Sequence, residues 1–338
     1  MNIYDISKKT GVSIATVSRV INGSSNVSEK TRAKVLAAIE ESGYTPNVFA
    51  RGLGLNTMKT IGIMCADSSD PYLAQAVYYI EQGLRKNNYD SLLSCTGYDH
   101  DTKENCLRLL ISKRVDAVIL VGSNYVETEE KNEYIRTAAQ TVPIMIVNGE
   151  ITAPNIYCTL CDDYSAIYEV TDNFIKSGKK DILYLYNSLS YSGTKKLEGF
   201  RAAMKANGLP VKENRLRFIE SHNMSVHETE KAFGEIVKNG NMPEGIVASD
   251  DVLAISALKY AKSAGISVPD ELFVAGFNNF VISECCDPEL TSVDNKLESL
   301  CQHCVSTLMS VFAEDKSVPK KTIFSAEIIE RETTKFIK

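Results

Sequence analysis

Three short segments at the start of the chain carry apolar residues at the spacing of a helix. A polar residue suited to cap a helix precedes each segment, and a glycine suited to end one follows it. These bounding residues are Asn2 and Gly11, Ser13 and Gly23, and Ser28 and Gly43. The side chains expected to face inward in the second and third helices are Val17, Val20, Ile21, Val35, Leu36 and Ile39. Because only Gly11-Val12-Ser13 separates the first two helices, the pattern predicts a helix-turn-helix, with a small three-helix packing module as the alternative.

From Thr60 onward, short runs of β-branched and aliphatic residues alternate with helical patterns. The runs predicted to be buried strands are Ile61–Ala66, Ser91–Cys95, Ala117–Val121, Ile144–Val147 and Ile156–Leu160, then Ile182–Tyr186, Leu216–Ile219, Gly245–Ala248 and Phe273–Phe277. Helices are predicted between them, for example over Tyr72–Asn87 and Lys103–Ser112. Such alternation is typical of parallel doubly wound sheets. Two series predict two lobes, each binding ligands at the carboxyl ends of its strands.

The composition is that of a globular protein of two or three domains. Its 338 residues are 44% hydrophobic and 24% charged, which excludes the disordered and fibrous classes. The longest apolar runs, Val115–Val121 and Pro143–Val147, are much shorter than the roughly 18–20 residues of a membrane helix. The amino terminus lacks the basic and apolar parts of a secretory signal. We therefore expect a cytoplasmic protein with no membrane partner.

Nine cysteines in a chain of this length indicate free thiols in a reducing compartment. Two C-x-x-C pairs, Cys158 with Cys161 and Cys301 with Cys304, keep zinc as an alternative. Roughly 140 residues separate the two pairs, so we expect no metal site.

The charge is divided unevenly along the chain. Residues 1–60 contain eight Lys or Arg and four Asp or Glu, a net charge of +4, whereas the remaining 278 residues carry a net charge of −10. A small basic segment ahead of an acidic body favours a module that binds a polyanion, attached to a part with another role. Chance clustering of charge is the alternative.

The second predicted helix offers side chains suited to DNA on the faces that its apolar residues leave free. They are Ile14, Ala15, Thr16, Ser18, Arg19 and Asn22. A guanidinium, hydroxyls and an amide can hydrogen-bond to base edges and phosphates, and small apolar groups can contact a thymine methyl.

Enzyme motifs are missing, because the sequence has no G-x-S-x-G, no H-E-x-x-H and no P-loop. Its four histidines are scattered along the chain. We therefore expect no catalytic residue and no cofactor.

Short motifs in the first fifty residues carry a more specific signal. They are Tyr4-Asp5-Ile6-Ser7, Gly11-Val12-Ser13, Thr16-Val17-Ser18-Arg19-Val20-Ile21-Asn22-Gly23, Val27-Ser28, Thr31-Arg32, Val35, Ala38-Ile39, Gly43-Tyr44 and Pro46-Asn47. Together they closely resemble the LacI/GalR family of bacterial repressors, and the resemblance continues to Lys338.

The resemblance implies an α/β chain with an N-terminal three-helix helix-turn-helix head and a hinge helix. A two-lobed periplasmic-binding-protein-like (type I) domain of doubly wound parallel sheets follows. The implied domains are residues 1–45 for DNA binding, 46–59 for the hinge helix and linker, and 60–338 for effector binding and dimerisation. Lobe 1 spans about 60–160 plus 294–323, and lobe 2 spans about 161–290 plus the C-terminal strand.

The same resemblance implies roles for residues of the head and hinge. Ile14, Ala15 and Arg19 occupy the principal major-groove positions, with Arg19 the candidate for a bidentate guanine contact. The residues that look like phosphate contacts are Ser13, Thr16, Ser18, Asn22 and Thr31. The hinge, residues 46–55, would fold in the minor groove, with Asn47, Ala50 and Arg51 at the DNA and Leu53 as a wedge between base pairs. A flexible tether, favoured by Gly52 and Gly54, is the alternative.

Effector contacts are expected in the loops at the strand ends. The residues at the corresponding positions are Asp70, Tyr72, Leu73, Ser123, Asn148, Ser190, Lys196, Met224, Asp251 and Asn278. Lys196 stands where the family usually has an arginine, so the charge stays but the planar fork is lost. Asn278 replaces an aspartate that usually holds two sugar hydroxyls, which weakens ordinary sugar chelation. Each of these residues could also be a cap or turn residue.

The function implied is that of a sequence-specific transcriptional regulator, a repressor that binds a near-palindromic DNA operator as a homodimer. A small polar, sugar-like metabolite in the cleft between the lobes would control it. One alternative is control by a phosphorylated protein partner. A solute-binding receptor and a sugar-processing enzyme on the same fold are the rivals from other classes.

Overall fold

The computed structural model describes residues 2–21, 25–43, 57–220, 225–238 and 242–337. It divides into two compact units, which are described separately. The first unit is the chain up to Thr60 together with Arg114–Asp116, and the second is the rest.

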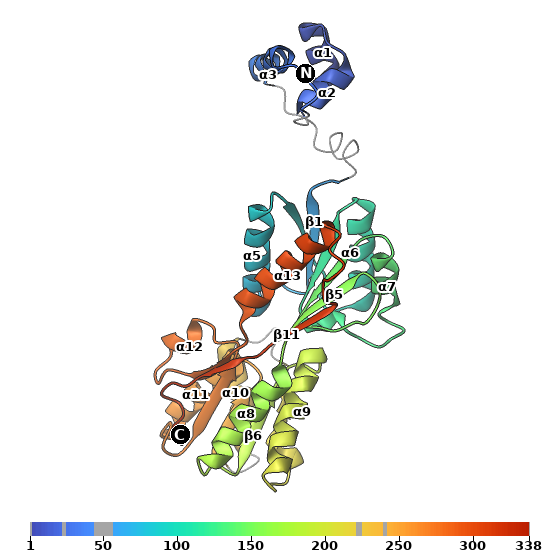
Figure 1. The fold of residues 1–338 in the computed structure, drawn as a ribbon. Coiled ribbons are helices and arrows are strands. Elements are labelled where there is room, and N and C mark those ends of the chain that lie inside the picture. The colour runs from blue at the N-terminus through green and yellow to red at the C-terminus, as the bar shows by residue number, and fades with distance from the viewer. Residues whose placement is uncertain (1, 22–24, 44–56, 221–224, 239–241, 338) are drawn as a thin grey trace. The chain divides into compact units, whose positions relative to one another are not determined.

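The first unit contains a head of three helices, α1 (Ile3–Thr10), α2 (Ile14–Ile21) and α3 (Glu29–Ser42), which are blue in Figure 1. Helix α1 begins with a capping box: the Asn2 side chain accepts hydrogen bonds from the Tyr4 and Asp5 N–H groups, and the Asp5 carboxylate accepts one from Asn2 N–H. It ends at Gly11, whose positive φ suits glycine. The predicted starts and ends of α1 and α3 are confirmed, as is the start of α2.

The head core is small and is built from the predicted helical stripes. Its buried side chains are Ile6, Val17, Val20, Val35 and Ala38. The prediction for Leu36 is wrong, because its side chain is 49% exposed. The inward stripe of α3 runs through positions 35, 38 and 39, and position 36 lies about 100° around the helix from position 35.

Two six-stranded sheets form the second unit and contain all the predicted strands. The first sheet has the spatial order β11-β5-β4-β3-β1-β2. Its strands are β1 (Thr60–Cys65), β2 (Asp90–Cys95), β3 (Ala117–Val121), β4 (Ile144–Val147), β5 (Ile156–Cys161) and β11 (Lys321–Phe324). The second sheet has the order β12-β10-β9-β8-β6-β7. Its strands are β6 (Ile182–Tyr186), β7 (Leu216–Phe218), β8 (Gly245–Ala248), β9 (Phe273–Phe277), β10 (Thr291–Asp294) and β12 (Glu327–Ile329). The recorded pairs are parallel except β10 with β12.

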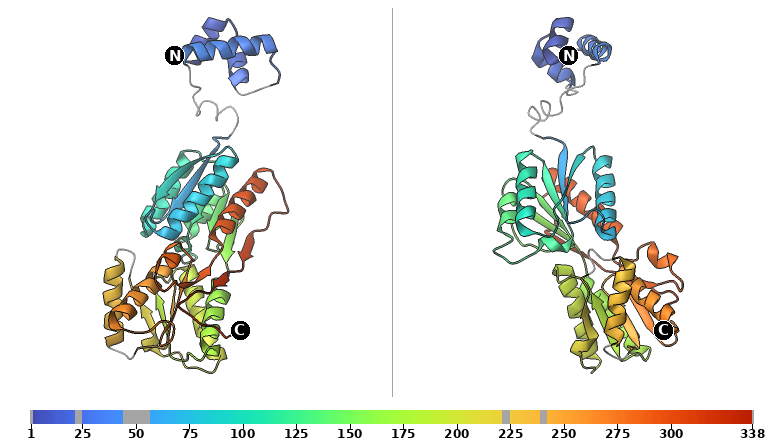
Figure 2. Two further views of the ribbon diagram at one scale, coloured as in Figure 1. Left: turned by 90° about the vertical axis from the view of Figure 1, so that its left-hand side faces the viewer. Right: turned by 180° about the vertical axis from the view of Figure 1, so that it is seen from behind.

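Helices cover both faces of each sheet, which gives the two predicted lobes (Figure 2). Lobe 1 carries α5 (Pro71–Lys86), α6 (His100–Ser112), α7 (Glu133–Ala139), α13 (Leu297–Phe312) and the short η1 (Ser123–Tyr125). Lobe 2 carries α8 (Asp163–Lys176), α9 (Tyr191–Ala206), α10 (Val226–Lys238), α11 (Asp251–Ala264), α12 (Ile282–Cys285) and the short η2 (Glu213–Arg215). In β6, Tyr184 packs toward α8 and α9, whereas Leu183 and Leu185 pack toward α10 and α11.

The chain crosses between the lobes more than once. After β10 in the second sheet, α13 packs against α5 on the first, as predicted. Strand β11 then joins the first sheet and β12 the second, so the last strands of the chain lie in different lobes (Figure 1).

Strand β2 is not buried, contrary to expectation. It lies at the edge of its sheet, and Leu92 and Leu93 are 36% and 47% exposed. An edge strand has a neighbour on one side only, so an apolar run by itself does not distinguish it from a central strand. Within the part of the chain described, no helix is long and apolar enough to cross a membrane.

The head core provides a matched pair of substitutions. Ile6→Ala removes a fully buried side chain and should destabilise the head by about 2–5 kcal/mol. Leu36→Ala removes an exposed side chain and should change stability by less than about 0.5 kcal/mol. Hydrogen exchange of the head amides in the full-length protein would measure both. Equal losses of protection would contradict the orientation of Leu36.

Candidate functional site

Helix α2 has an apolar face that packs in the head core and another face that is exposed. Val17 and Val20 are buried in the head core, while Ile14, Ala15 and Arg19 are exposed. Three of the predicted base-reading side chains therefore lie on the surface of a helix whose opposite side packs in the head core. This arrangement can place a guanidinium and two small apolar groups in a major groove.

Hydroxyl groups mark the amino termini of α2 and α3. Ser13 Oγ accepts a hydrogen bond from Thr16 N–H at 3.2 Å and lies 2.9 Å from Thr16 Oγ1. Ser28 and Thr31 repeat this arrangement at the start of α3. The dipole of a helix amino terminus attracts phosphate. Ser18, on α2, is half-buried. Asn22, Asn47, Ala50, Arg51 and Leu53 lie outside the described residues, so their predicted roles stay predictions.

A cavity of about 140 Å³ lies in the second unit and is lined by residues of both lobes. The predicted effector residues that line it are Asp70, Tyr72, Leu73, Ser123, Asn148, Ser190, Lys196 and Asn278. The structure thus brings together residues that are far apart in sequence, because parallel strands end at a common edge of each sheet.

A hydrogen bond across the cavity joins the two lobes. Ser123 Oγ, just after β3 in lobe 1, donates to Ser190 Oγ at the start of α9 in lobe 2, at 2.8 Å. Ser190 also caps α9 by accepting from Gly193 N–H at 3.4 Å. The lobe arrangement is therefore linked directly to residues that a bound ligand would touch.

Lys196 is a buried cation at the cavity wall. Its Nζ donates to the Ser249 carbonyl oxygen at 3.0 Å and lies 3.5 Å from the centroid of the Phe277 ring, a cation–π contact. Burial raises the pKa of Asp163, which the charge of Lys196 opposes. Burial also raises the pKa of Asp250, against the Leu253 N–H hydrogen bond and Lys196. A single ammonium thus stabilises two buried carboxylates.

Two buried polar atoms at the cavity have no hydrogen-bond partner among the residues that the structure describes. They are Tyr72 Oη and Asn124 Nδ2, and both residues line the cavity. A buried polar group left unpaired costs about 1–3 kcal/mol, so a ligand that pairs with it recovers that cost. Asn278 Oδ1, by contrast, already has a partner, because it accepts a hydrogen bond from Asn295 Nδ2 at 2.8 Å.

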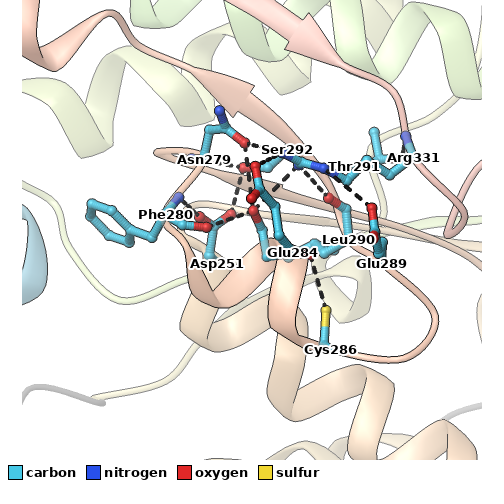
Figure 3. A network of polar contacts seen from close by, with 11 residues as sticks. Asp251, Asn279, Phe280, Glu284, Cys286, Glu289, Leu290, Thr291, Ser292 and Arg331 are labelled. Carbon is cyan, nitrogen blue, oxygen red and sulfur yellow. Dashed lines mark hydrogen bonds and ion pairs between the residues drawn. The ribbon is translucent and has the colours of Figure 1, made fainter.

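Asp251 lies outside the cavity lining, and its neighbour Asp250 lines the cavity instead. Asp251 is fully buried and accepts hydrogen bonds from Ser292 Oγ at 2.5 Å and Phe280 N–H at 2.8 Å (Figure 3). A Cβ on Gly276 would lie 2.3 Å from Asp251 Oδ1, so only glycine fits beside this carboxylate. Asp251 therefore supports the turn after β9 that carries Asn278. Met224 lies outside the described residues.

The turn after β9 is fixed from a second side by Arg331. Its guanidinium donates to Asn279 Oδ1 at 2.8 Å and to the Leu290 carbonyl oxygen at 2.9 Å (Figure 3). Asn278 and Asn279 both have positive φ angles, 99° and 50°. Non-glycine residues rarely adopt this conformation, so the network stabilises a strained turn next to the cavity.

Several lining residues were not among the ten predicted effector residues, although some of them lie in the loops where contacts were expected. They are Tyr98, Gly122, Asn124, Asn187, Ser188, Ser192, Gly193, Ser249 and Asp250. A signal for some of them was available, because Asn187 and Ser249 directly follow β6 and β8. Residues at that place in a parallel sheet face its ligand-binding edge.

The environment of Asp251 predicts a pH-dependent stability. Burial raises its pKa from an ordinary value of 3.8 to about 7, against the hydrogen bonds from Ser292 and Phe280. Between these values the folded chain binds more protons than the unfolded chain, so the contribution of Asp251 to stability falls as the pH rises. Wild type should therefore lose about 2 kcal/mol of unfolding free energy between about pH 5 and pH 7 through Asp251. The Asp251→Asn variant has no carboxyl group here, so its unfolding free energy should rise by that amount relative to wild type over the same pH range.

Denaturant unfolding of both proteins at each pH measures this gain. Asp270→Asn is the control, since the Asp270 carboxylate is exposed and a hydrogen bond from Lys335 lowers its pKa. A constant difference between Asp251→Asn and wild type across the pH range would contradict the prediction.

Comparisons with known proteins find relatives of both the head and the body. Residues 2–47 match the bacterial regulatory proteins of the lacI family, and residues 171–334 match a periplasmic binding protein-like domain. An HTH-type transcriptional regulator of Lachnoclostridium phytofermentans is 54% identical over 99% of this chain and 100% of that protein. Catabolite control protein A of Staphylococcus aureus is 31% identical over 99% of each chain.

The fold also matches a solved structure. The lac repressor dimer bound to operator and the anti-inducer ONPF is similar with a TM-score of 0.86 and 23% identity over 98% of each chain. With a helix-turn-helix head, a two-lobed body and a full-length relative at 54% identity, this chain belongs to the LacI family of bacterial transcriptional regulators, which are not enzymes.

Proposed function

We propose that this chain is a repressor that binds a near-palindromic operator as a homodimer and responds to a small polar, sugar-like metabolite in the cavity between its lobes. The proposed domains are residues 1–45 for reading DNA, 46–59 for the hinge and 60–338 for sensing and dimerisation. Because its target is operator DNA, the protein acts in the cytoplasm.

The observation that carries the effector role is the polar cavity itself. It draws lining residues from both lobes, contains the Ser123–Ser190 hydrogen bond, and borders the unpartnered Tyr72 Oη and Asn124 Nδ2. A ligand that pairs with such groups favours one arrangement of the lobes over another. That difference in affinity is the free energy available to change DNA binding.

A dimer follows from the size of the reading surface. Helix α2 has eight residues and exposes only three of the predicted base-reading side chains, which is too few contacts for a specific site. Two heads related by a two-fold axis would read two half-sites about one helical turn apart. Residues 46–59 would connect each head to its body, with Leu53 as the minor-groove wedge.

Arg19 provides the test of base reading. Arg19→Ala should weaken binding to the specific operator by about 1–3 kcal/mol, or about 5- to 150-fold, and affect random DNA far less. Lys34→Ala removes another exposed cation from the head and is the control. Gel-shift titrations over a salt series measure both. Equal losses on operator and random DNA for Arg19→Ala would contradict its role.

A thermal-shift screen tests the effector site. The panel contains neutral sugars, sugar acids, phosphosugars and nucleobases. A compound at about 100 times its Kd adds about 2.7 kcal/mol of stability and so raises the Tm.

The Lys196→Gln variant should show no rise in Tm with such a compound, because the substitution removes the ammonium at the cavity wall. The control Lys195→Gln, with an exposed ammonium paired with Glu198, should keep the rise. If no compound raises the Tm, but a phosphorylated protein changes operator affinity, control by a protein partner replaces the metabolite.

A further inference from the structure

Two of the nine cysteines lie in contact at the cavity end of lobe 1. Cys65 Sγ and Cys95 Sγ are 3.9 Å apart. Cys65 ends β1 and Cys95 ends β2, and these strands are neighbours in the sheet. Neither thiol has a role in the function proposed above.

The backbone sets the two cysteines side by side. Thr96 N–H donates to the Cys65 carbonyl oxygen at 2.9 Å, and Gly97 N–H donates to the Ala66 carbonyl oxygen at 2.8 Å. Neighbouring strands are about 4.7–4.9 Å apart, within the range of Cα separations that disulfides span, about 4.4–6.8 Å. The two sulfur atoms need to approach by about 1.9 Å to form a bond.

The two thiols differ in environment, and this difference gives them separate roles. Cys95 is exposed, whereas Cys65 is fully buried. Burial raises the pKa of Cys65 to about 12, with the neighbouring Cys95 as the second cause. A small oxidant therefore meets the exposed Cys95 first. The Cys65 sulfur lies within reach of the oxidised sulfur, and its raised pKa makes its attack the slow step, because the thiolate is the nucleophile.

We propose that Cys65 and Cys95 form a reversible thiol–disulfide site, oxidised by peroxide, that alters the effector cavity. In the first step the Cys95 sulfur attacks one oxygen of hydrogen peroxide. The O–O bond breaks, Cys95 becomes a sulfenic acid, and one water leaves. In the second step the Cys65 sulfur attacks the Cys95 sulfur, the S–O bond breaks, and a second water leaves. Two thiols are oxidised by two electrons and one peroxide is reduced; a dithiol reverses the reaction.

The link to the cavity is the chain that follows each cysteine. Five residues after Cys65 comes Asp70, and three residues after Cys95 comes Tyr98; both line the cavity. Thr96 Oγ1 also lies 3.0 Å from Tyr125 Oη, a fully buried group. A disulfide ties the ends of β1 and β2 together covalently and so restricts both lining segments.

The test uses the full-length protein. The protein is first reduced with a dithiol, the dithiol is then removed, and one equivalent of hydrogen peroxide is added. We expect two of the nine thiols to disappear and to return with fresh dithiol. Peptide mapping without reduction should recover Cys65 linked to Cys95 within one chain. The Tm should shift by at least about 2 °C on oxidation.

Three variants make the assignment specific. Cys65→Ser and Cys95→Ser should each abolish the linked peptide and the Tm shift. Cys285→Ser removes an exposed cysteine of lobe 2 and should change neither result. Mapping of the wild-type chain gives the answer independently of whether Cys65→Ser folds.

Other outcomes overturn the proposal. One such outcome is that all nine thiols remain after peroxide treatment. Another is that mapping finds Cys285 linked to Cys286 in place of Cys65 linked to Cys95, or finds two chains joined covalently through Cys95. A Cys65–Cys95 disulfide that leaves both the Tm and the operator affinity unchanged would overturn the link to the cavity. The thiol count and mapping need no effector, so they stand or fall separately from the proposed metabolite site.

Discussion

Parallel strands impose the constraint on which the body of this protein depends. Both faces of each sheet are covered by helices, so polar loops gather where the strands end. In lobe 1 the ends of β1, β3 and β4 deliver Asp70, Ser123 and Asn148, and in lobe 2 the end of β9 delivers Asn278. The cavity is therefore a consequence of strand direction, and its chemistry is set by the few residues that follow each strand.

One buried ammonium at the cavity wall opposes the cost of burying two nearby carboxyl groups. Lys196 lies between the Ser249 carbonyl oxygen and the Phe277 ring and opposes the effect of burial on Asp163 and Asp250. An arginine here would present a planar fork of N–H donors to a ligand. The ammonium of Lys196 is a compact charge that is already in contact with protein groups. Tyr72 and Asn124 add neutral hydrogen-bonding groups to the charge of Lys196 at the cavity.

Sequence periodicity predicted the helices and strands well, because their bounds follow from caps, glycines and apolar runs. It failed where burial depends on neighbours distant in sequence. Leu36 and β2 look like core elements locally, but helix phase exposes the first and a sheet edge exposes the second. Asp250 and Asp251 differ by about 100° around α11, and the sequence pattern alone did not indicate which one lines the cavity. The contact between Cys65 and Cys95 required the strand pairing itself.

The last strands of the chain have a consequence for how the body is synthesised. Strand β11 (Lys321–Phe324) pairs with β5 in the first sheet, and β12 (Glu327–Ile329) pairs with β10 in the second. During translation, β5 and β10 therefore stay paired on one side only until residues 321–329 have been made. Neither lobe is a continuous stretch of the chain, so neither could be obtained by cutting the gene at a single point.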